Sequence, residues 1–308
     1  MKKLALLLGA LSLVSSVAYA KEVVPAVEEV VVVEEAAPVA APALRVTSFG
    51  QSIEVDNNAG KANGDIGNVM LGHKVGLAYG DDWTFSVFAR KGWDMDTDDG
   101  VHSNGHRLEL DAWRAFDNYS LGLRWRQESD LDRYYLRGKY SYGMLSGSAD
   151  VWYEAKNAAE TDGVQDNYQV ELIPFVLNYG PFGVGYFFNY KEGVGSTNNK
   201  EGDFDHYMEH QIRAYANFAL TEKLSTYAEY RITLGAENEQ YGKKYDKYDA
   251  GDYHKLEVGA SYALTENLSV NGYYAYELGD VTDEAKEVSS KEKDQRYGEF
   301  CIGWTYSF

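Results

Sequence analysis

The 308-residue sequence contains one cysteine, Cys301, and only 5 prolines. A single cysteine excludes an intramolecular disulfide bond. The sequence also lacks the motifs of phosphate-binding loops, nucleophile elbows and zinc sites, and its 6 histidines match no such pattern. We therefore expect no enzyme, no metal centre and no cofactor.

Basic residues are scarce, with 29 Lys and Arg against 48 Asp and Glu, for a net charge of −19. Such an acidic balance argues against nucleic acid as a partner. It is compatible with a cation-attracting surface, or with divalent ions bound at a lipopolysaccharide layer.

Long hydrophobic runs are absent, apart from one at the start of the chain. Lys2 and Lys3 form a basic region, an apolar region follows to Val17, and Ala18-Tyr19-Ala20 is a cleavage site. Residues 1–20 are therefore predicted to be a signal peptide, whose removal would bring the net charge to −21. No other segment has the roughly 18 apolar residues of a membrane helix. An exported chain of this kind is periplasmic, secreted or an outer-membrane barrel.

Residues 21–44 are rich in Pro, Ala, Val and Glu. Pro25, Pro38 and Pro42 discourage a continuous helix or strand, which predicts a periplasmic linker. The alternative is a short helix, Ala26 to Ala37, that associates with copies of itself or enters the barrel. The remaining residues, 45–308, carry the fold.

The sequence ends on a strictly alternating strand. Phe300, Ile302, Trp304, Tyr306 and Phe308 share one face, which a barrel would turn toward lipid. A terminal Phe resembles the signal that the barrel-assembly machinery recognises in outer-membrane proteins. The composition agrees, because a barrel that places apolar residues at every second position is rich in Tyr and Gly, here 26 and 30.

Six tight turns with flanking aromatic residues alternate with seven longer polar connections. The turns lie at 79–83, 116–119, 142–145, 179–182, 218–224 and 262–268, and the connections at about 56–66, 92–104, 128–132, 156–166, 192–204, 235–252 and 279–295. This pattern predicts an all-β, transmembrane, up-and-down antiparallel β-barrel of 14 strands, with 12 or 16 as the alternatives. The last strand would pair with the first near Arg45 to Val55. Pro174 predicts a bulge or an inward apolar patch within its strand.

Charged residues occupy the face opposite the apolar one. Because Arg or Lys facing lipid costs roughly 2–4 kcal/mol, these charges should line a water-filled lumen. The predicted pore-lining and selectivity residues are Arg90, Arg107, Glu109, Asp111, Arg124, Arg126, Glu128, Arg137, Lys139, Asp150, Glu154, Glu209, Arg213, Glu229, Arg231 and Glu257. Basic residues concentrate on the third to sixth strands and Glu on the later strands, which predicts two opposed walls and a transverse field.

Two alternatives accompany this prediction. The charges could merely pair across strands to rigidify a solvated wall. The arginines could form a track for anionic oligosaccharides, with Trp113, Tyr135 or Trp152 as stacking platforms.

Asp94, Asp96 and Asp98 lie in a predicted connection and have part of a calcium-loop spacing. The Gly and Glu of that motif are missing, so a solvated loop is the better interpretation.

The first 26 residues, MKKLALLLGALSLVSSVAYAKEVVPA, resemble the signal peptide and mature start of the fusobacterial major outer-membrane porins. The close resemblance covers about 40 residues and is architectural beyond them. It implies a passive diffusion channel for small hydrophilic solutes and ions in the outer membrane of a Gram-negative cell. Porins of this family are often trimeric, so the resemblance adds a homotrimer to the expected partners and leaves a monomer as the alternative. An adhesive or structural barrel, contacting other cells through its loops, is the alternative. Arg-lined porins for oligogalacturonates are a weaker similarity.

Overall fold

The computed structural model describes residues 43–57, 67–96, 100–156, 165–195, 205–240, 243–281 and 293–308. The predicted signal peptide lies outside these residues, as does all but the end of the predicted linker. Within the described ranges there is no helix long and apolar enough to cross a membrane. Every regular element found there is a β-strand.

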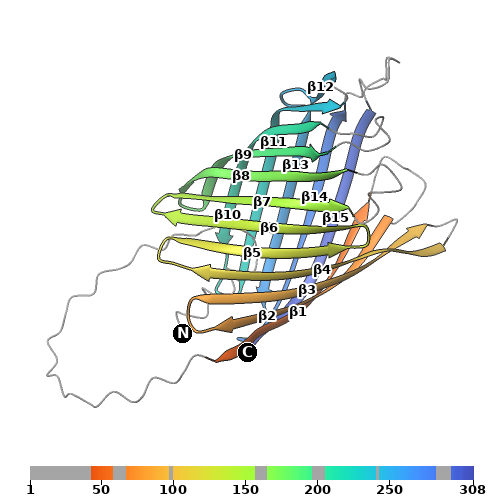
Figure 1. The fold of residues 1–308 in the computed structure, drawn as a ribbon. Coiled ribbons are helices and arrows are strands. Elements are labelled where there is room, and N and C mark those ends of the chain that lie inside the picture. The colour runs from red at the N-terminus through yellow and green to blue at the C-terminus, as the bar shows by residue number, and fades with distance from the viewer. Residues whose placement is uncertain are drawn as a thin grey trace, which may run out of the picture.

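The strands form one antiparallel sheet that closes on itself (Figure 1). They are β1 Leu44–Asn57, β2 Gly67–Tyr79, β3 Trp83–Asp96, β4 Gly100–Ala115, β5 Tyr119–Glu128, β6 Leu131–Tyr142, β7 Leu145–Lys156, β8 Asp166–Tyr179, β9 Phe182–Val194, β10 His206–Ala219, β11 Leu224–Gln240, β12 Lys243–Tyr248, β13 Tyr253–Ala263, β14 Leu268–Val281 and β15 Lys293–Ser307. Apart from β12, each strand pairs with the strands before and after it in the sequence, and β1 pairs with β15. Across β12, β11 pairs with β13. The pairing of β10 with β11 completes the ring.

Among the described strands, β12 pairs only with β11, as a hairpin beyond the wall, so fourteen strands form the barrel. The predicted number is therefore confirmed. The last strand pairs with the first from Ser48 to Asn57, close to the predicted stretch. Leu44, which was predicted to end the linker, is the first residue of β1.

The six predicted tight turns are all present, and aromatic residues flank them. Tyr79 pairs with Trp83 across the first turn, Phe116 stacks on Tyr119 at the second, and Tyr179 at the fourth is 80 % exposed. β1 begins and β15 ends at this same end of the barrel, where Leu44 pairs with Tyr79. Both ends of the wall therefore lie beside the short turns.

Several long connections are shorter than predicted because the strands continue. The segment 92–104 was predicted to be a loop, but β3 reaches Asp96 and β4 starts at Gly100. The segment 235–252 contains the end of β11 and all of β12. Beyond the wall both faces of a hairpin meet water, so polar residues there do not end a strand. Of the aspartates weighed for calcium, Asp94 and Asp96 belong to β3, and Asp98 lies outside the described residues.

The polarity of the barrel is inverted relative to a soluble protein. Leu121, Leu123 and Leu136 on the outer face are 54 to 65 % exposed, whereas Glu109 and Glu229 on the inner face are 7 % exposed. Alternation along each strand puts these two sets on opposite faces. At Pro174 the register shifts on both sides of β8, so the predicted bulge is confirmed.

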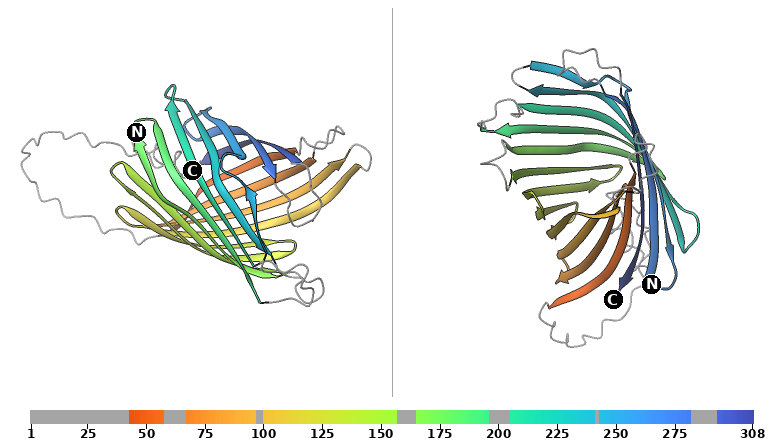
Figure 2. Two further views of the ribbon diagram at one scale, coloured as in Figure 1. Left: turned by 90° about the horizontal axis from the view of Figure 1, so that it is seen from above. Right: turned by 90° about the vertical axis from the view of Figure 1, so that its right-hand side faces the viewer.

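The barrel order also fixes which strands face each other across the interior. In a ring of fourteen strands, each strand lies opposite the one seven places away. Therefore β4, β5, β6 and β7 face β11, β13, β14 and β15. Figure 1 shows β4–β7 in the near wall with β13–β15 behind them, and Figure 2 gives two further views of the two walls.

Candidate functional site

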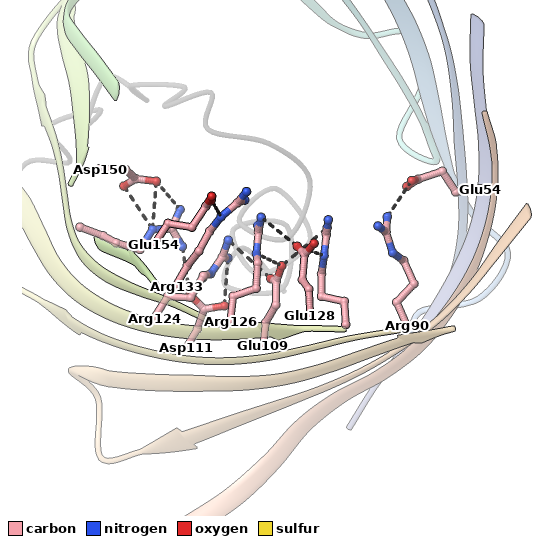
Figure 3. A network of polar contacts seen from close by, with 12 residues as sticks. Glu54, Arg90, Glu109, Asp111, Arg124, Arg126, Glu128, Arg133, Asp150 and Glu154 are labelled. Atoms are coloured by element: carbon pink, nitrogen blue, oxygen red, sulfur yellow. Dashed lines mark hydrogen bonds and ion pairs between the residues drawn. The ribbon is translucent and has the colours of Figure 1, made fainter. Parts of the chain in front are cut away.

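The inner faces of β4–β7 form one charged surface, which we call the arginine wall (Figure 3). The strands alternate apolar and charged residues, so every second side chain enters the barrel. Its charged members are Arg107, Glu109, Asp111, Arg124, Arg126, Glu128, Arg133, Arg137, Lys139, Asp150, Glu154 and Lys156. Cations outnumber carboxylates among them.

Asp111 lies at the centre of the arginine wall. Its two carboxylate oxygens accept hydrogen bonds from Nε and Nη2 of Arg124, each at 2.9 Å. Arg137 donates to the same carboxylate at 3.0 Å and to Asp150 at 2.9 Å. Paired geometry of this kind, with planar guanidinium groups on carboxylates, is the strong form of an ion pair. These contacts hold the arginine heads at fixed places along the wall.

Glu109 connects a second group of arginines. Its carboxylate lies 2.8 Å from Nε of Arg126, 3.5 Å from Arg124 and 3.8 Å from Arg107. Arg107 in turn donates to Glu128 at 2.9 Å. The arginines keep about a fifth of their side-chain surface exposed, so water screens the pairs and each stabilises the barrel only modestly.

Glu154 is the most deeply buried carboxylate of the wall, at 2 % exposure. Arg133 lies 2.5 Å from one of its oxygens and Lys156 2.7 Å from the other, and Asn167 donates at 2.9 Å. Arg133 was not among the predicted pore-lining residues, although it shares the phase of Arg137 and Lys139. The alternation alone would have found it.

Aromatic rings cover the arginine wall between the charges. Tyr135 and Trp152 stack with centroids 4.9 Å apart and are 7 % and 6 % exposed. The side chains of Arg137 and Lys139 both lie 4.9 Å from the centroid of the Trp113 ring. The three aromatic residues considered as stacking platforms for sugars are therefore already occupied by protein groups.

Trp113 lies flat on the wall because its neighbour is a glycine. A Cβ built on Gly122 would stand 2.6 Å from two atoms of the indole ring. We expect Gly122→Ala to push Trp113 off the wall, destabilising the barrel by about 1–3 kcal/mol and reducing the single-channel conductance. Urea unfolding in lipid vesicles and conductance recordings measure the two effects.

Gly138→Ala is the matched control for Gly122→Ala. Gly138 is on the next strand, and a Cβ there would meet only Leu121 Cδ2, at an ordinary 3.8 Å. If the two variants have equal unfolding free energies and equal conductances, the close packing of Trp113 on Gly122 does not matter for stability or for the passage.

The opposite inner face, on β11 and β13–β15, is the glutamate wall. Its charged members among the described side chains are Glu229, Arg231, Lys255, Glu257, Glu277 and Glu299. Arg231 lies 2.6 Å from Glu229, and Lys255 lies 2.8 Å from Glu277. Here the carboxylates outnumber the cations.

The other two carboxylates of the glutamate wall have neutral donors. The phenol of Tyr227 donates to Glu257 at 2.9 Å, and the phenol of Tyr273 donates to Glu299. Tyr227 lies flat over Gly259, as Trp113 does over Gly122. A phenol is a neutral donor, so its hydrogen bond adds no positive charge beside the carboxylate.

A chain of polar contacts runs along the inner face of β10 and reaches the glutamate wall on β11. Glu209 accepts from Gln211 at 2.6 Å, Gln211 accepts from Arg213 at 3.0 Å, and Arg213 lies 3.9 Å from Glu229. The Arg213 guanidinium also covers the ring of Phe187 at 3.5 Å. Both predicted residues of this strand therefore face inward and are held in place.

Between the two walls on the other side of the ring, on β1–β3, Arg90 lies 3.0 Å from Glu54. Glu54, Asp56 and Glu299 offer carboxylate oxygens within 4.8 Å of one another, close enough to share a cation. Arg90 and Tyr273 already contact two of these three groups. Sequence reasoning missed Glu54, and also Lys74, which belongs to the inner face of β2.

All sixteen predicted pore-lining residues lie on inward phases of their strands. The predicted separation into two walls also appears, but the basic wall is not purely basic. Asp111, Glu109 and Glu128 lie directly beside the arginines that they neutralise. A role of these residues in selectivity remains a prediction.

Comparison with solved structures bears on the fold. A bacterial polysaccharide outer-membrane secretin superposes with a TM-score of 0.51 at 9 % identity, over 84 % of this chain and 98 % of the other. The chain therefore has the fold of an outer-membrane barrel. OmpT of Vibrio cholerae (TM-score 0.45, 13 % identity, 86 % and 98 % covered) and an anion-selective porin from Comamonas acidovorans (0.43, 12 %, 86 % and 100 %) are more distant. No family model and no curated protein sequence matches the chain.

Proposed function

We propose that the protein is an outer-membrane porin, a passive diffusion channel for small hydrophilic solutes and ions. The inverted polarity of the closed barrel carries this proposal. Leucines stand exposed on the outside while arginine–carboxylate networks line the inside. Lipid is the medium in which that outer face is stable, and water is the medium in which the inner face is stable.

The dimensions of the barrel suit diffusion. Fourteen strands spaced about 4.8 Å apart and tilted by about 40° enclose a backbone diameter of about 28 Å in a round barrel. The inward side chains on opposite walls occupy about 10 Å of this width, since packed sheets stand about 10 Å apart. The remaining passage, about 15–20 Å wide, admits hydrated ions, sugars and short peptides.

The orientation and partners follow from the same proposal. The short turns, with both ends of the wall, face the periplasm, and the long hairpins face outward near lipopolysaccharide. The closing strand β15, with Phe308 directly after it, is the part that the barrel-assembly machinery would recognise. The amino-terminal resemblance supports membership of the fusobacterial porin family and a homotrimer.

Solute uptake by liposomes tests the proposal. Vesicles containing the folded protein should swell in neutral sugars, at rates that fall steeply as the sugar grows from a monosaccharide to a tetrasaccharide. Vesicles containing the heat-denatured protein are the control. Folded protein that admits no sugar of any size would refute the porin function and leave the adhesive or structural barrel as the better proposal.

A further inference from the structure

The two charged walls face each other across the lumen. The strand order places β5 opposite β13, and β4 opposite β11. Arg124 lies five residues from the start of β5 at a short turn, and Glu229 lies five residues from the start of β11 at another. The centres of the arginine wall and of the glutamate wall are therefore at similar depths.

Neither wall neutralises itself. Lys139 contacts the Trp113 ring, but no carboxylate of the described residues lies within 4.0 Å of its ammonium group. The Glu257 carboxylate has no basic partner within that distance among the described residues, and the one hydrogen bond that it accepts there comes from Tyr227. Together with the surplus of cations on one wall and of carboxylates on the other, these groups create a field across the lumen.

We propose that this field selects zwitterionic solutes whose carboxylate and ammonium groups lie several ångströms apart, that is, short peptides. The inference rests on the proposed porin function and specifies the solute class that the porin favours. The carboxylate end of such a solute turns toward the arginine wall and its ammonium end toward the glutamate wall.

The size of a short peptide suits this orientation. An extended tripeptide separates its terminal charges by about 10 Å, a large part of a passage about 15–20 Å wide. Electrostatic potentials of several kT arise inside charged clefts. The free energy of an oriented solute is lowered in proportion to the fraction of the potential drop that its two charges span. A solute of similar size without charged groups is not stabilised in this way.

Triglycine and its doubly capped form, N-acetyl-triglycine amide, provide the test. The two molecules share a backbone and differ in their terminal charges. In liposome swelling the wild-type protein should admit triglycine about two- to fivefold faster than the capped form. The singly capped forms, one anionic and one cationic, show whether one charge is sufficient.

A matched pair of triple variants assigns the effect to the walls. Lys139→Gln with Glu257→Gln and Glu299→Gln removes three lumen charges while keeping amide groups that can accept from the tyrosines. Lys223→Gln with Glu222→Gln and Glu266→Gln makes the same three changes on exposed short turns. The lumen variant should lose the preference for triglycine, and the turn variant should keep it.

The outcomes separate the two proposals. If the sugars and both peptide forms fail to enter vesicles containing folded protein, the porin function falls and the inference falls with it. If the sugars enter but triglycine shows no advantage in the wild-type protein, the porin function stands and the inference is overturned. An equal preference in the lumen and turn variants also overturns it, because the wall charges would then not be its cause.

Discussion

Replacing Leu123 with arginine should destabilise the folded barrel by about 2–4 kcal/mol. Leu123 lies on the outer face of β5, four residues from the turn at Tyr119, and is 58 % exposed. If this face contacts acyl chains, a guanidinium there loses its hydration without gaining a partner. Urea unfolding in lipid vesicles, followed by tryptophan fluorescence, measures the change in the free energy of unfolding.

Leu220→Arg is the control for Leu123→Arg. Leu220 is almost equally exposed, at 57 %, but it lies in the short turn after β10, outside the apolar band. The cost there should fall to about 0–1 kcal/mol. A similar, small effect at both positions would mean that the outer face of β5 is in water, which contradicts a membrane barrel.

Replacing Arg124, Arg126 and Arg137 together with glutamine should raise the cation/anion permeability ratio by about three- to tenfold. These arginines partner Glu109, Asp111 and Asp150. Their removal leaves negative charge on both walls, so cations are attracted and anions repelled. The reversal potential of the channel under a KCl gradient measures the ratio directly.

Arg114→Gln is the control for the arginine variants. Arg114 lies on the outer face near a turn, with its guanidinium 5.6 Å from the Trp83 ring and 5.1 Å from the Phe116 ring. This substitution removes an arginine from the same strand as Asp111 without changing the lumen. If the triple variant folds and its reversal potential matches that of Arg114→Gln, the arginines serve only to brace the wall.

Sequence patterns were sufficient for the parts of the fold that depend on local chemistry. Alternation assigned Glu109 and Asp111 to the inner face and Leu121 and Leu123 to the outer one, because a strand in a membrane has only those two environments. The tight turns were legible because glycine and aromatic residues mark them. Gly80, Gly143 and Gly180, for example, adopt positive φ in three of the turns.

The sequence was less informative where two segments must be placed against each other. That Asp111 binds Arg124 and Arg137 depends on the register of β4, β5 and β6, which no local signal specifies. At 92–104 and 235–252 the strands are longer, and the loops between them shorter, than the sequence predicted, because strands outside the membrane need not alternate. The sequence alone therefore suggested a more basic wall than the structure has, because Glu109 and Asp111 pair with its arginines.

Single-channel recording in planar lipid bilayers tests the central claim, that a water-filled, charged passage runs through this barrel. The folded protein should give discrete current steps that scale with the salt concentration, and a reversal potential that changes when arginines of the wall are replaced. Folded barrels that insert into the bilayer without producing current steps would contradict the claim.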